Sequence, residues 1–270
     1  VRLDAVLTLA SGESLTVPGF FMVPYRREVI QGNELMLPEG PGQWRVRLTG
    51  AETGPMVCRL TASDRTGTVD LPLGQVLVTA SSRLGFVKVS PVDPHYLVYE
   101  SGAPYLPIGH NLPIYPTSGQ RVDQALDKMA AAGENWNRWW MSNQGLGLEW
   151  ESRLGHYRQA QAAQLDLALD LARERGLTYM LCMDTHQDFR EAGWQANPFN
   201  AIHGGPCKTP QDWFTSAEAR SLYRKRLRYT VARWSYSPGI LCWEFGNEFE
   251  GWADTEQKAI LAWHREMASY

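Results

Sequence analysis

The chain has 270 residues, of which 44% are hydrophobic and 20% are charged, with 24 glycines and 16 prolines. This composition is typical of a globular protein and excludes a disordered chain, collagen or a small disulfide scaffold. The net charge of −3 and the lack of an apolar run of roughly 20 residues argue against a nucleic-acid-binding or membrane protein.

The start of the chain does not indicate the cellular compartment of the protein. The sequence begins with Val1, and no charged start followed by an apolar segment marks a signal peptide. Either a leader has been removed, as in a secreted or periplasmic protein, or the chain is part of a longer one. The four cysteines, at positions 58, 182, 207 and 242, lack the close spacing of a zinc or redox site. We predict no cofactor.

Apolar and polar residues alternate from residue 1 to about residue 89, as they do in half-buried strands. The clearest runs are residues 3–9, 14–20, 43–49, 56–60 and 69–78. Clusters rich in Gly, Pro and Asp separate them, at residues 11–12, 38–42 and 64–67. Short strands with such turns predict an N-terminal antiparallel β-sandwich domain over residues 1–89.

From residue 90 onward, short apolar strands alternate with amphipathic helices. The strands are predicted at residues 105–109, 135–141, 177–183 and 240–245. Four helices are predicted between and after these strands. The first runs from near Val122 to Gly133, the second ends at Gly176, and the third spans residues 216–234. The fourth starts at a capping box of Asp254 and Gln257. Four strand–helix repeats indicate parallel strands with helical crossovers.

Polar residues gather where these predicted strands end. His110 and Asn111 follow the first strand, Arg138 lies in the second, residues 184–186 follow the third, and Asn247 and Glu248 follow the fourth. In a (β/α)8 barrel, reactive residues lie at the carboxyl ends of the strands. The pattern therefore favours a TIM-type barrel, of which residues 90–270 carry about the first half, over a small open sheet.

The segment from Trp243 to Glu248, Trp-Glu-Phe-Gly-Asn-Glu, carries the clearest functional signal. An apolar strand runs directly into Asn247 and Glu248, which places an amide and a carboxyl at the strand end. Hydrolysis of a glycosidic bond needs a proton donor near the leaving oxygen and a second carboxyl across the sugar ring. For the Asn-Glu dipeptide alone, a Glu that merely caps the next loop is the alternative interpretation.

With its surroundings, this segment resembles the clan of retaining glycoside hydrolases with (β/α)8 barrels, which includes cellulases and β-mannanases. The fourth strand of that clan ends in a pattern like W-E-x-x-N-E. Residues 197–200, 204–207 and 229–238 also resemble the clan, so the likeness covers about residues 86–254. The N-terminal part is similar, more loosely, to an uncharacterised β-domain often found in front of such barrels.

The resemblance implies roles for individual residues. Glu248 would be the acid/base, Asn247 would contact the sugar 2-hydroxyl, and Arg138 would orient the catalytic carboxylates. By position alone, substrate contacts are expected from His110, Asn111 and His186.

The second catalytic carboxylate has no match in this sequence. In the clan the nucleophile is a Glu at the end of the seventh strand, whereas Glu244 is expected to be a structural residue paired with Arg138. A complete barrel takes about 250 residues, and roughly 180 follow the predicted sandwich. We therefore expect a fragment of a longer enzyme, or a chain that needs a partner supplying the other half. Alone it should be inactive, and its exposed edges should favour association with the missing half or into a homo-oligomer.

Three further patterns each have a plainer alternative. Trp194 and Trp252, like Trp150 and Trp213, could stack on sugar rings from loops, or simply pack between loops and helices. Asp184 and His186, with His110, could hold a metal, but no further ligand pair is evident and we predict no metal site. The basic run over residues 220–228 is interpreted as the solvated face of a helix.

The preferred interpretation is a retaining glycoside hydrolase that cleaves a polysaccharide or oligosaccharide by double displacement, with Glu248 as acid/base. The runner-up is a non-catalytic carbohydrate-binding or assembly module on a barrel scaffold, and a metal-dependent hydrolase is a third option. The sugar, the linkage, endo or exo action and the role of the N-terminal part are left open.

Overall fold

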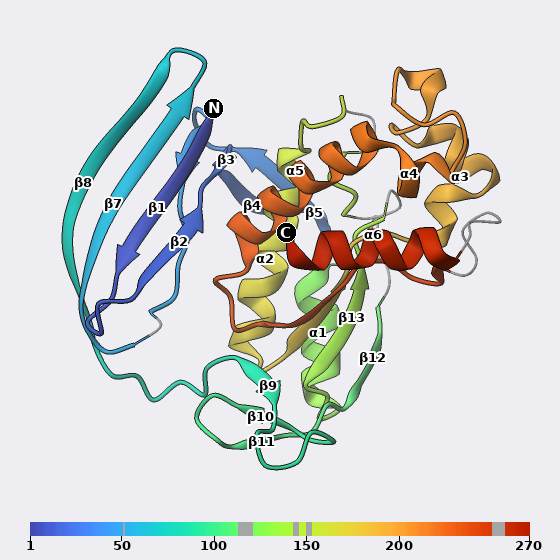
Figure 1. Ribbon diagram of the computed structural model, residues 1–270. Coiled ribbons are helices and arrows are strands. Elements are labelled where there is room, and N and C mark those ends of the chain that lie inside the picture. Colours follow the sequence, from blue (N-terminus) through green and yellow to red (C-terminus); the bar gives the residue numbers. More distant parts are fainter. Residues whose placement is uncertain (51, 113–120, 143–145, 150–152, 250–256) are drawn as a thin grey trace. The chain divides into compact units, whose positions relative to one another are not determined.

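The computed structural model describes residues 1–50, 52–112, 121–142, 146–149, 153–249 and 257–270 (Figure 1). Its contacts divide the chain into two compact units. Unit 1 consists of Val1–Pro24, Gly40–Tyr105 and Leu227–Pro238, and unit 2 consists of Tyr25–Glu39, Leu106–Arg226 and Gly239–Tyr270. The predicted domains 1–89 and 90–270 stay a prediction.

Unit 1 contains a four-stranded antiparallel sheet in the order β2-β1-β7-β8 (Figure 1). Its strands are β1 (Arg2–Thr8), β2 (Ser14–Pro18), β7 (Gly54–Asp64) and β8 (Gly67–Val78). These are four of the runs in which apolar and polar residues alternate, so the prediction of antiparallel strands is confirmed there.

The predicted β-sandwich is not confirmed. The other strands that the structure describes in unit 1 form small sheets of their own. One is a pair, β3 (Phe20–Met22) with β6 (Gln43–Arg45), and the other is a three-stranded sheet of β9 (Val87–Val89), β10 (Leu97–Tyr99) and β11 (Pro104–Tyr105).

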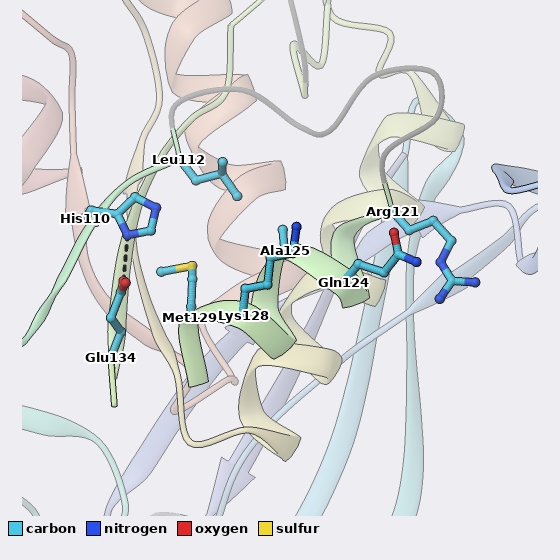
Figure 2. A pocket seen from close by; sticks show the side chains of 8 residues that line it. All are labelled: His110, Leu112, Arg121, Gln124, Ala125, Lys128, Met129 and Glu134. Carbon is cyan, nitrogen blue, oxygen red and sulfur yellow. Dashed lines mark hydrogen bonds and ion pairs between the residues drawn. The ribbon is translucent and has the colours of Figure 1, made fainter. Parts of the chain in front are cut away.

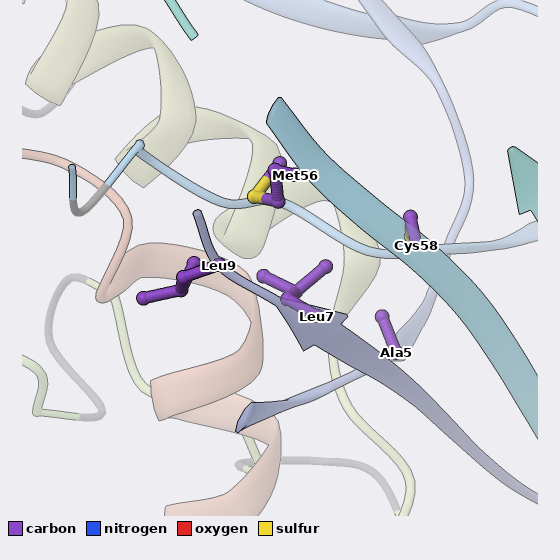
Figure 3. Close-up of a cluster of buried hydrophobic side chains, with 5 residues drawn as sticks. All are labelled: Ala5, Leu7, Leu9, Met56 and Cys58. Carbon is purple, nitrogen blue, oxygen red and sulfur yellow. The ribbon is translucent and has the colours of Figure 1, made fainter. Parts of the chain in front are cut away.

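One face of the four-stranded sheet supplies the core of unit 1. Every second residue of β1 and β7 points to this face, where Ala5, Leu7, Leu9, Met56 and Cys58 form a buried cluster (Figure 3). By contrast, the residues of β8 are almost all exposed. The sheet is therefore buried at β1 and open at β8.

The segment Leu227–Pro238 is tied to the N-terminal strands within unit 1. The guanidinium of Arg228 donates to the carbonyl of Leu3 at 3.0 Å and forms an ion pair with Asp4. The ring of Tyr229 meets Phe20 edge-on at 6.3 Å between centroids. These contacts explain why a helix end groups with strands more than 200 residues earlier.

Unit 2 is built on a parallel sheet in the order β12-β13-β14-β15. The strands are β12 (Gly109–Asn111), β13 (Trp136–Trp140), β14 (Thr178–Cys182) and β15 (Ile240–Glu244). Strand order follows chain order, and helices connect the strands. The predicted alternation of parallel strands and helices is therefore confirmed, and it matches the start of a barrel.

The predicted first strand, residues 105–109, is wrong. Tyr105 instead pairs with Leu97 in the antiparallel three-stranded sheet, and the parallel strand begins at Gly109. His110 and Asn111 consequently lie within β12 rather than after it. Pro107 lacks the N–H that a continuous strand through this run would need.

The helices of unit 2 largely follow the predicted ranges. They are α1 (Val122–Ala131), α2 (Gln159–Glu174), α3 (Glu191–Ala196), α4 (Asp212–Thr215), α5 (Ala217–Trp234), whose end belongs to unit 1, and α6 (Gln257–Ser269), with short 3-10 turns η1 (His186–Phe189) and η2 (Ala201–His203). The predicted cap at Asp254 lies outside the described residues. Among the helices described, none is both long and apolar enough to cross a membrane.

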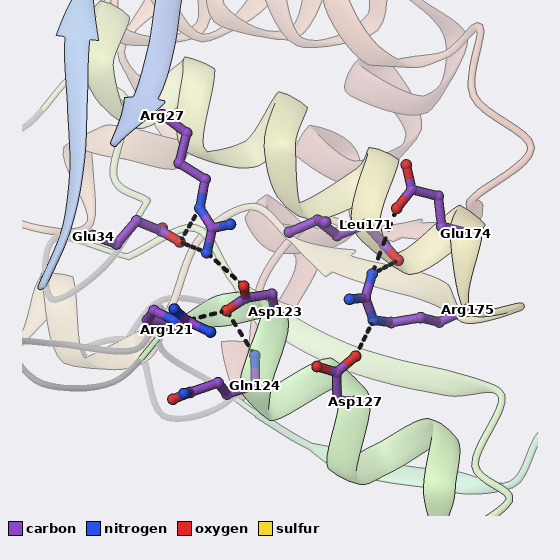
Figure 4. A network of polar contacts seen from close by, with 9 residues as sticks. All are labelled: Arg27, Glu34, Arg121, Asp123, Gln124, Asp127, Leu171, Glu174 and Arg175. Carbon is purple, nitrogen blue, oxygen red and sulfur yellow. Dashed lines mark hydrogen bonds and ion pairs between the residues drawn. The ribbon is translucent and has the colours of Figure 1, made fainter. Parts of the chain in front are cut away.

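A hairpin from the first forty residues belongs to unit 2. It pairs β4 (Tyr25–Ile30) with β5 (Asn33–Pro38). Arg27 on this hairpin binds Glu34 at 2.8 Å and reaches Asp123 in the first turn of α1 at 2.9 Å (Figure 4). One arginine thus fastens the hairpin to the helix that follows β12.

Candidate active site at the ends of the parallel strands

The segments that follow β14 and β15 are joined to each other. The main-chain N–H of Asn247 donates to the carbonyl of Asp184 at 3.0 Å, and Thr185 forms a parallel bridge with Asn247. Parallel strands end at the same edge of a sheet, so residues more than 60 positions apart in the chain meet here. The edge is the one at which a barrel carries its chemistry.

Arg138 on β13 is the centre of the hydrogen-bond network at this edge. Its Nε and Nη2 donate to the two carboxylate oxygens of Glu244 at 2.7 and 2.6 Å, and Nη2 also donates to Asn247 Oδ1 at 2.8 Å. The hydrogen bonds to Glu244 raise the pKa of Arg138 despite its partial burial. The expected pairing of Arg138 with Glu244 is confirmed.

The network fixes the orientation of the Asn247 amide. Since Oδ1 accepts from Arg138, Nδ2 is the atom that faces His186, and it lies 2.9 Å from Nδ1 of that ring. The same Nδ1 lies 3.4 Å from Glu248 Oε2. A continuous chain of polar contacts therefore runs from Glu244 through Arg138, Asn247 and His186 to Glu248.

Glu248 combines an accessible carboxylate with an unusual backbone. Its side chain is 55% exposed, against 14% for His186, so a ligand can reach the carboxylate from solvent. Its φ of +53° lies in the left-handed region, which is uncommon for a residue other than glycine and clusters at functional sites. The position at the strand end is therefore held in place by its surroundings at a cost in backbone strain.

Trp140 completes this group and was not singled out from the sequence. Its ring meets His186 edge-on at 6.3 Å, and the Arg138 guanidinium lies 5.8 Å from the ring centroid. The signal was present, because residues 138 and 140 share one face of a strand. Trp139, on the opposite face, is fully buried against Tyr179.

His110 lies apart from this network. Its Nδ1 is 2.7 Å from Glu134 Oε2, and its ring lines a cavity of about 330 Å³ beside α1 (Figure 2). The remaining lining residues are Leu112, Arg121, Gln124, Ala125, Lys128 and Met129. Asn111 is exposed on β12 and stands in register with Arg138 on β13. Of the two candidate residues on β12, His110 and Asn111, only Asn111 is therefore aligned with the network.

Two of the four tryptophans that were predicted as possible sugar platforms, Trp194 and Trp213, lie among the described residues. Trp194 is only 8% exposed and stacks on Phe189, so its ring is not available to a sugar, and we correct that prediction. Trp213 is 1% exposed and belongs to the aromatic core. Trp150 and Trp252 lie outside the described residues.

The motif at residues 197–207 builds a tight loop. The Asn197 side chain accepts from the Phe199 N–H and donates to the carbonyl of Asp188, and Asn200 likewise bridges two main-chain groups. A Cβ on Gly205 would lie 2.3 Å from the main chain of Phe199, so only glycine fits there. This motif supports the loop after β14 without entering the network.

Asp184, considered above as a metal ligand, has another role. Both of its carboxylate oxygens accept from Arg226 Nη2 at 2.6 Å. Among the residues that the structure describes, no group of three or more His, Cys, Asp or Glu side chains is placed to hold a metal ion.

Comparison with known proteins relates the chain to glycoside hydrolases. No family model matches. Mannan endo-1,4-beta-mannosidase 4 of Oryza sativa subsp. japonica is 26% identical over 157 residues, 55% of this chain and 34% of that protein. Mannan endo-1,4-beta-mannosidase 5 of Solanum lycopersicum is 24% identical over 205 residues, 69% of this chain and 47% of that protein.

Solved structures support the same fold. A provisionally assigned glycoside hydrolase from Bacteroides vulgatus ATCC 8482 matches 99% of this chain and 49% of its own with a TM-score of 0.66 at 16% identity. The exo-beta-1,4-mannosidase Op5Man5 from Opitutaceae bacterium strain TAV5 matches 64% of this chain and 31% of its own, with a TM-score of 0.50 at 20% identity.

The chain spans about a third to a half of the length of the curated relatives that it matches. Within that span the sequence is homologous to mannan endo-1,4-beta-mannosidases, and the match to the solved glycoside hydrolase structure shows a shared fold.

Proposed function

We propose that residues 1–270 carry the acid/base half of a retaining glycoside hydrolase that cleaves β-1,4-linked mannosides. The observation that supports this most is the chain of contacts from Arg138 through Asn247 and His186 to Glu248. The curated relatives, which act on mannan by their names, support the choice of sugar.

In this proposal Glu248 performs both proton transfers. It protonates the departing glycosidic oxygen in the first step, and the resulting carboxylate then activates the water that releases the sugar from the enzyme. Asn247 would hydrogen-bond the sugar 2-hydroxyl, where contacts strengthen as the transition state forms. Arg138 and His186 would hold the Asn247 amide in the orientation that this contact requires.

We assign the nucleophile to no residue within 1–270. A retaining mechanism needs a second carboxyl about 5–5.5 Å from the acid/base. Glu244 is a poor candidate because both of its carboxylate oxygens accept hydrogen bonds from Arg138. The nucleophile and the remaining barrel strands would be supplied from outside these residues, by a longer chain or by a partner.

The test is Glu248→Gln in the native gene product that carries this chain. We expect turnover of β-1,4-mannan to fall by about 10²- to 10⁴-fold, because general acid–base catalysis contributes about that much. Activity on aryl mannosides with good leaving groups should fall less, and added azide should restore turnover by replacing the activated water.

The matched control is Glu174→Gln, which removes an exposed carboxyl at the end of α2. It should leave turnover nearly unchanged. Full activity of the Glu248 variant would refute the assignment. Mannan binding without turnover in the unaltered protein would point to the non-catalytic carbohydrate-binding module instead.

A further inference from the structure

Asp184, whose carbonyl accepts from Asn247 of the candidate active site, forms a buried ion pair with Arg226. Nη2 of Arg226, on α5, donates to both carboxylate oxygens of Asp184, each at 2.6 Å. The side chain of Arg226 is only 14% exposed and that of Asp184 only 6%. Burial raises the pKa of Asp184, and Arg226 offsets this only in part. The pKa of Arg226 is raised because the nearby carboxylates outweigh its own burial. Arg226 carries the positive charge that every arginine keeps in a protein.

The surroundings of Arg226 leave it little freedom. Its guanidinium lies 4.6 Å from the ring centroid of Tyr223 and 6.0 Å from that of Phe199, the loop residue that Gly205 approaches. A second buried carboxylate, Glu149 Oε2, lies 3.6 Å from Arg226 Nη1. Aromatic rings and two acids thus surround the arginine and define where its guanidinium sits.

The main chain of Asp184 is hydrogen-bonded to the residues at the strand ends. Its carbonyl accepts both the Asn247 N–H at 3.0 Å and the Cys182 thiol at 3.2 Å. The side chain of one residue is thus fixed by α5, while its carbonyl fixes the residue that precedes Glu248. Because Glu248 has a strained left-handed φ, its carboxylate depends on such support for its direction.

A buried ion pair is a poor source of stability. Removing two charges from water costs several kcal/mol per ion, and well-packed apolar residues often do as well or better. Its value here must therefore lie elsewhere. Displacing a catalytic group by as little as 1 Å can lower the rate by about 10²-fold. This ion pair holds the segment that carries the acid/base.

We infer that Arg226 and Asp184 are positioning residues for the reaction, acting on Asn247 and Glu248 through the Asp184 carbonyl. This inference rests on the proposed function. Neither side chain touches the substrate. Their loss lowers the turnover number, because the acid/base points in the wrong direction, while substrate binding is largely kept.

The test compares Arg226→Lys and Asp184→Asn in the native gene product with β-1,4-mannan as substrate. Both variants keep the size of the side chain, but lysine lacks the planar guanidinium and asparagine lacks the charge. We expect kcat to fall by about 10- to 100-fold with less than about a twofold change in KM. The double variant should be no worse than the poorer single variant, because the two residues act as one unit.

Arg228→Met is the matched control, since Arg228 lies two residues further along α5 and pairs with Asp4 in unit 1. It should leave kcat unchanged. Unchanged kcat in both Arg226→Lys and Asp184→Asn would overturn the inference, and so would a loss of kcat equal to that of the control.

The Arg226→Lys substitution made in the Glu248→Gln variant distinguishes failure of this inference from failure of the proposed function. In Glu248→Gln, Arg226→Lys should cause a clearly smaller further loss of kcat than it causes in the unaltered protein, because the acid/base is already absent and only the positioning of Asn247 is left to lose. A full additional loss would show a merely structural role and overturn the inference. Full activity of Glu248→Gln itself would instead overturn the proposed function.

Discussion

The antiparallel sheet of unit 1 and the parallel sheet of unit 2 both have four strands, yet they use their residues differently. In unit 1 alternate residues of β1 and β7 form one buried face, and β8 is exposed. In unit 2 the central strand β14 is largely buried, and the polar residues of the candidate site lie either within the strands, as Arg138 does, or directly after them, as His186 and Asn247 do. Antiparallel strands end alternately at two edges, whereas parallel strands all end at one. Only the second arrangement gathers the ends of all strands, and the polar residues there, at one edge of the sheet.

The aromatic core of unit 2 should give the largest effect on stability. Trp213 is 1% exposed, and the rings of Trp263, Tyr223 and Phe189 lie within 4.6 to 5.0 Å of its own. Trp213→Ala should lower the free energy of unfolding by about 3–5 kcal/mol, measured by urea denaturation. Trp44→Ala, at a ring that is 42% exposed, should cost far less. Equal losses would contradict this description of the core.

The buried face of unit 1 should give the next largest effect. Leu7 is 2% exposed and packs with Met56 and Cys58. Leu7→Ala should therefore destabilise the protein by about 2–4 kcal/mol, in the usual range for a truncated core leucine, as seen in chemical denaturation. A loss below about 0.5 kcal/mol would mean that this face is not a core.

The chemistry of unit 2 should depend on the shape of the Arg138 side chain more than on its charge. Lysine keeps the charge but cannot bind Glu244 and Asn247 with a planar fork. We expect Arg138→Lys to lower kcat/KM on mannan by about 10²-fold, or ~2.7 kcal/mol, with a smaller change in unfolding free energy. Retention of more than half the activity would show that the fork is not required.

The pH dependence of stability should reveal the second acid beside Arg226. Burial raises the pKa of Glu149 above its ordinary value of 4.5. The folded state therefore favours the protonated acid, so this stabilisation is complete below about pH 4.5 and is lost as the pH rises through the raised pKa. Glu149→Gln should remove this part of the decrease in stability with rising pH, measured as the Tm from thermal unfolding curves at a series of pH values. Glu174→Gln, an exposed carboxyl, is the control, and an identical slope in wild type and Glu149→Gln would refute the prediction.

The open side of the unit 1 sheet should give the smallest effect. Leu71 on β8 faces Leu60 across the sheet but is 53% exposed. Leu71→Ala should change the unfolding free energy by no more than about 0.5 kcal/mol, which makes it the partner measurement to Leu7→Ala. A loss of 2 kcal/mol or more would reveal that something covers this strand in solution.

Local patterns in the sequence predicted much of this structure, because strand and helix periods are local properties. β13, β14 and α5 lie within two residues of their predicted bounds. The convergence of Arg138, Asn247 and Glu248 was also foreseeable, because parallel strands fix which ends meet. β12 was missed because three residues are too few for a periodic signal, and the apolar run before it belongs to another sheet.

What the sequence did not reveal depends on tertiary partners. The basic run in α5 was interpreted as a solvated face, but Arg220 and Arg224 bind Glu266 and Arg226 binds Asp184. A charged residue gives the same local pattern whether water or a buried acid surrounds it. The burial of Trp194 was likewise hidden: its stacking partner Phe189 lies only five residues earlier, but a tryptophan beside a loop gives the same local pattern whether its ring is packed or exposed.

The hairpin of β4 and β5 has a practical consequence for anyone who wishes to express unit 2 alone. A shortened gene that starts near residue 90 would omit Arg27, one of the two arginines that Asp123 binds at the start of α1. Such a product should be prone to misfolding even though every strand of the parallel sheet is encoded. A viable version would graft residues 25–39 onto it, by circular permutation or as a separately added peptide.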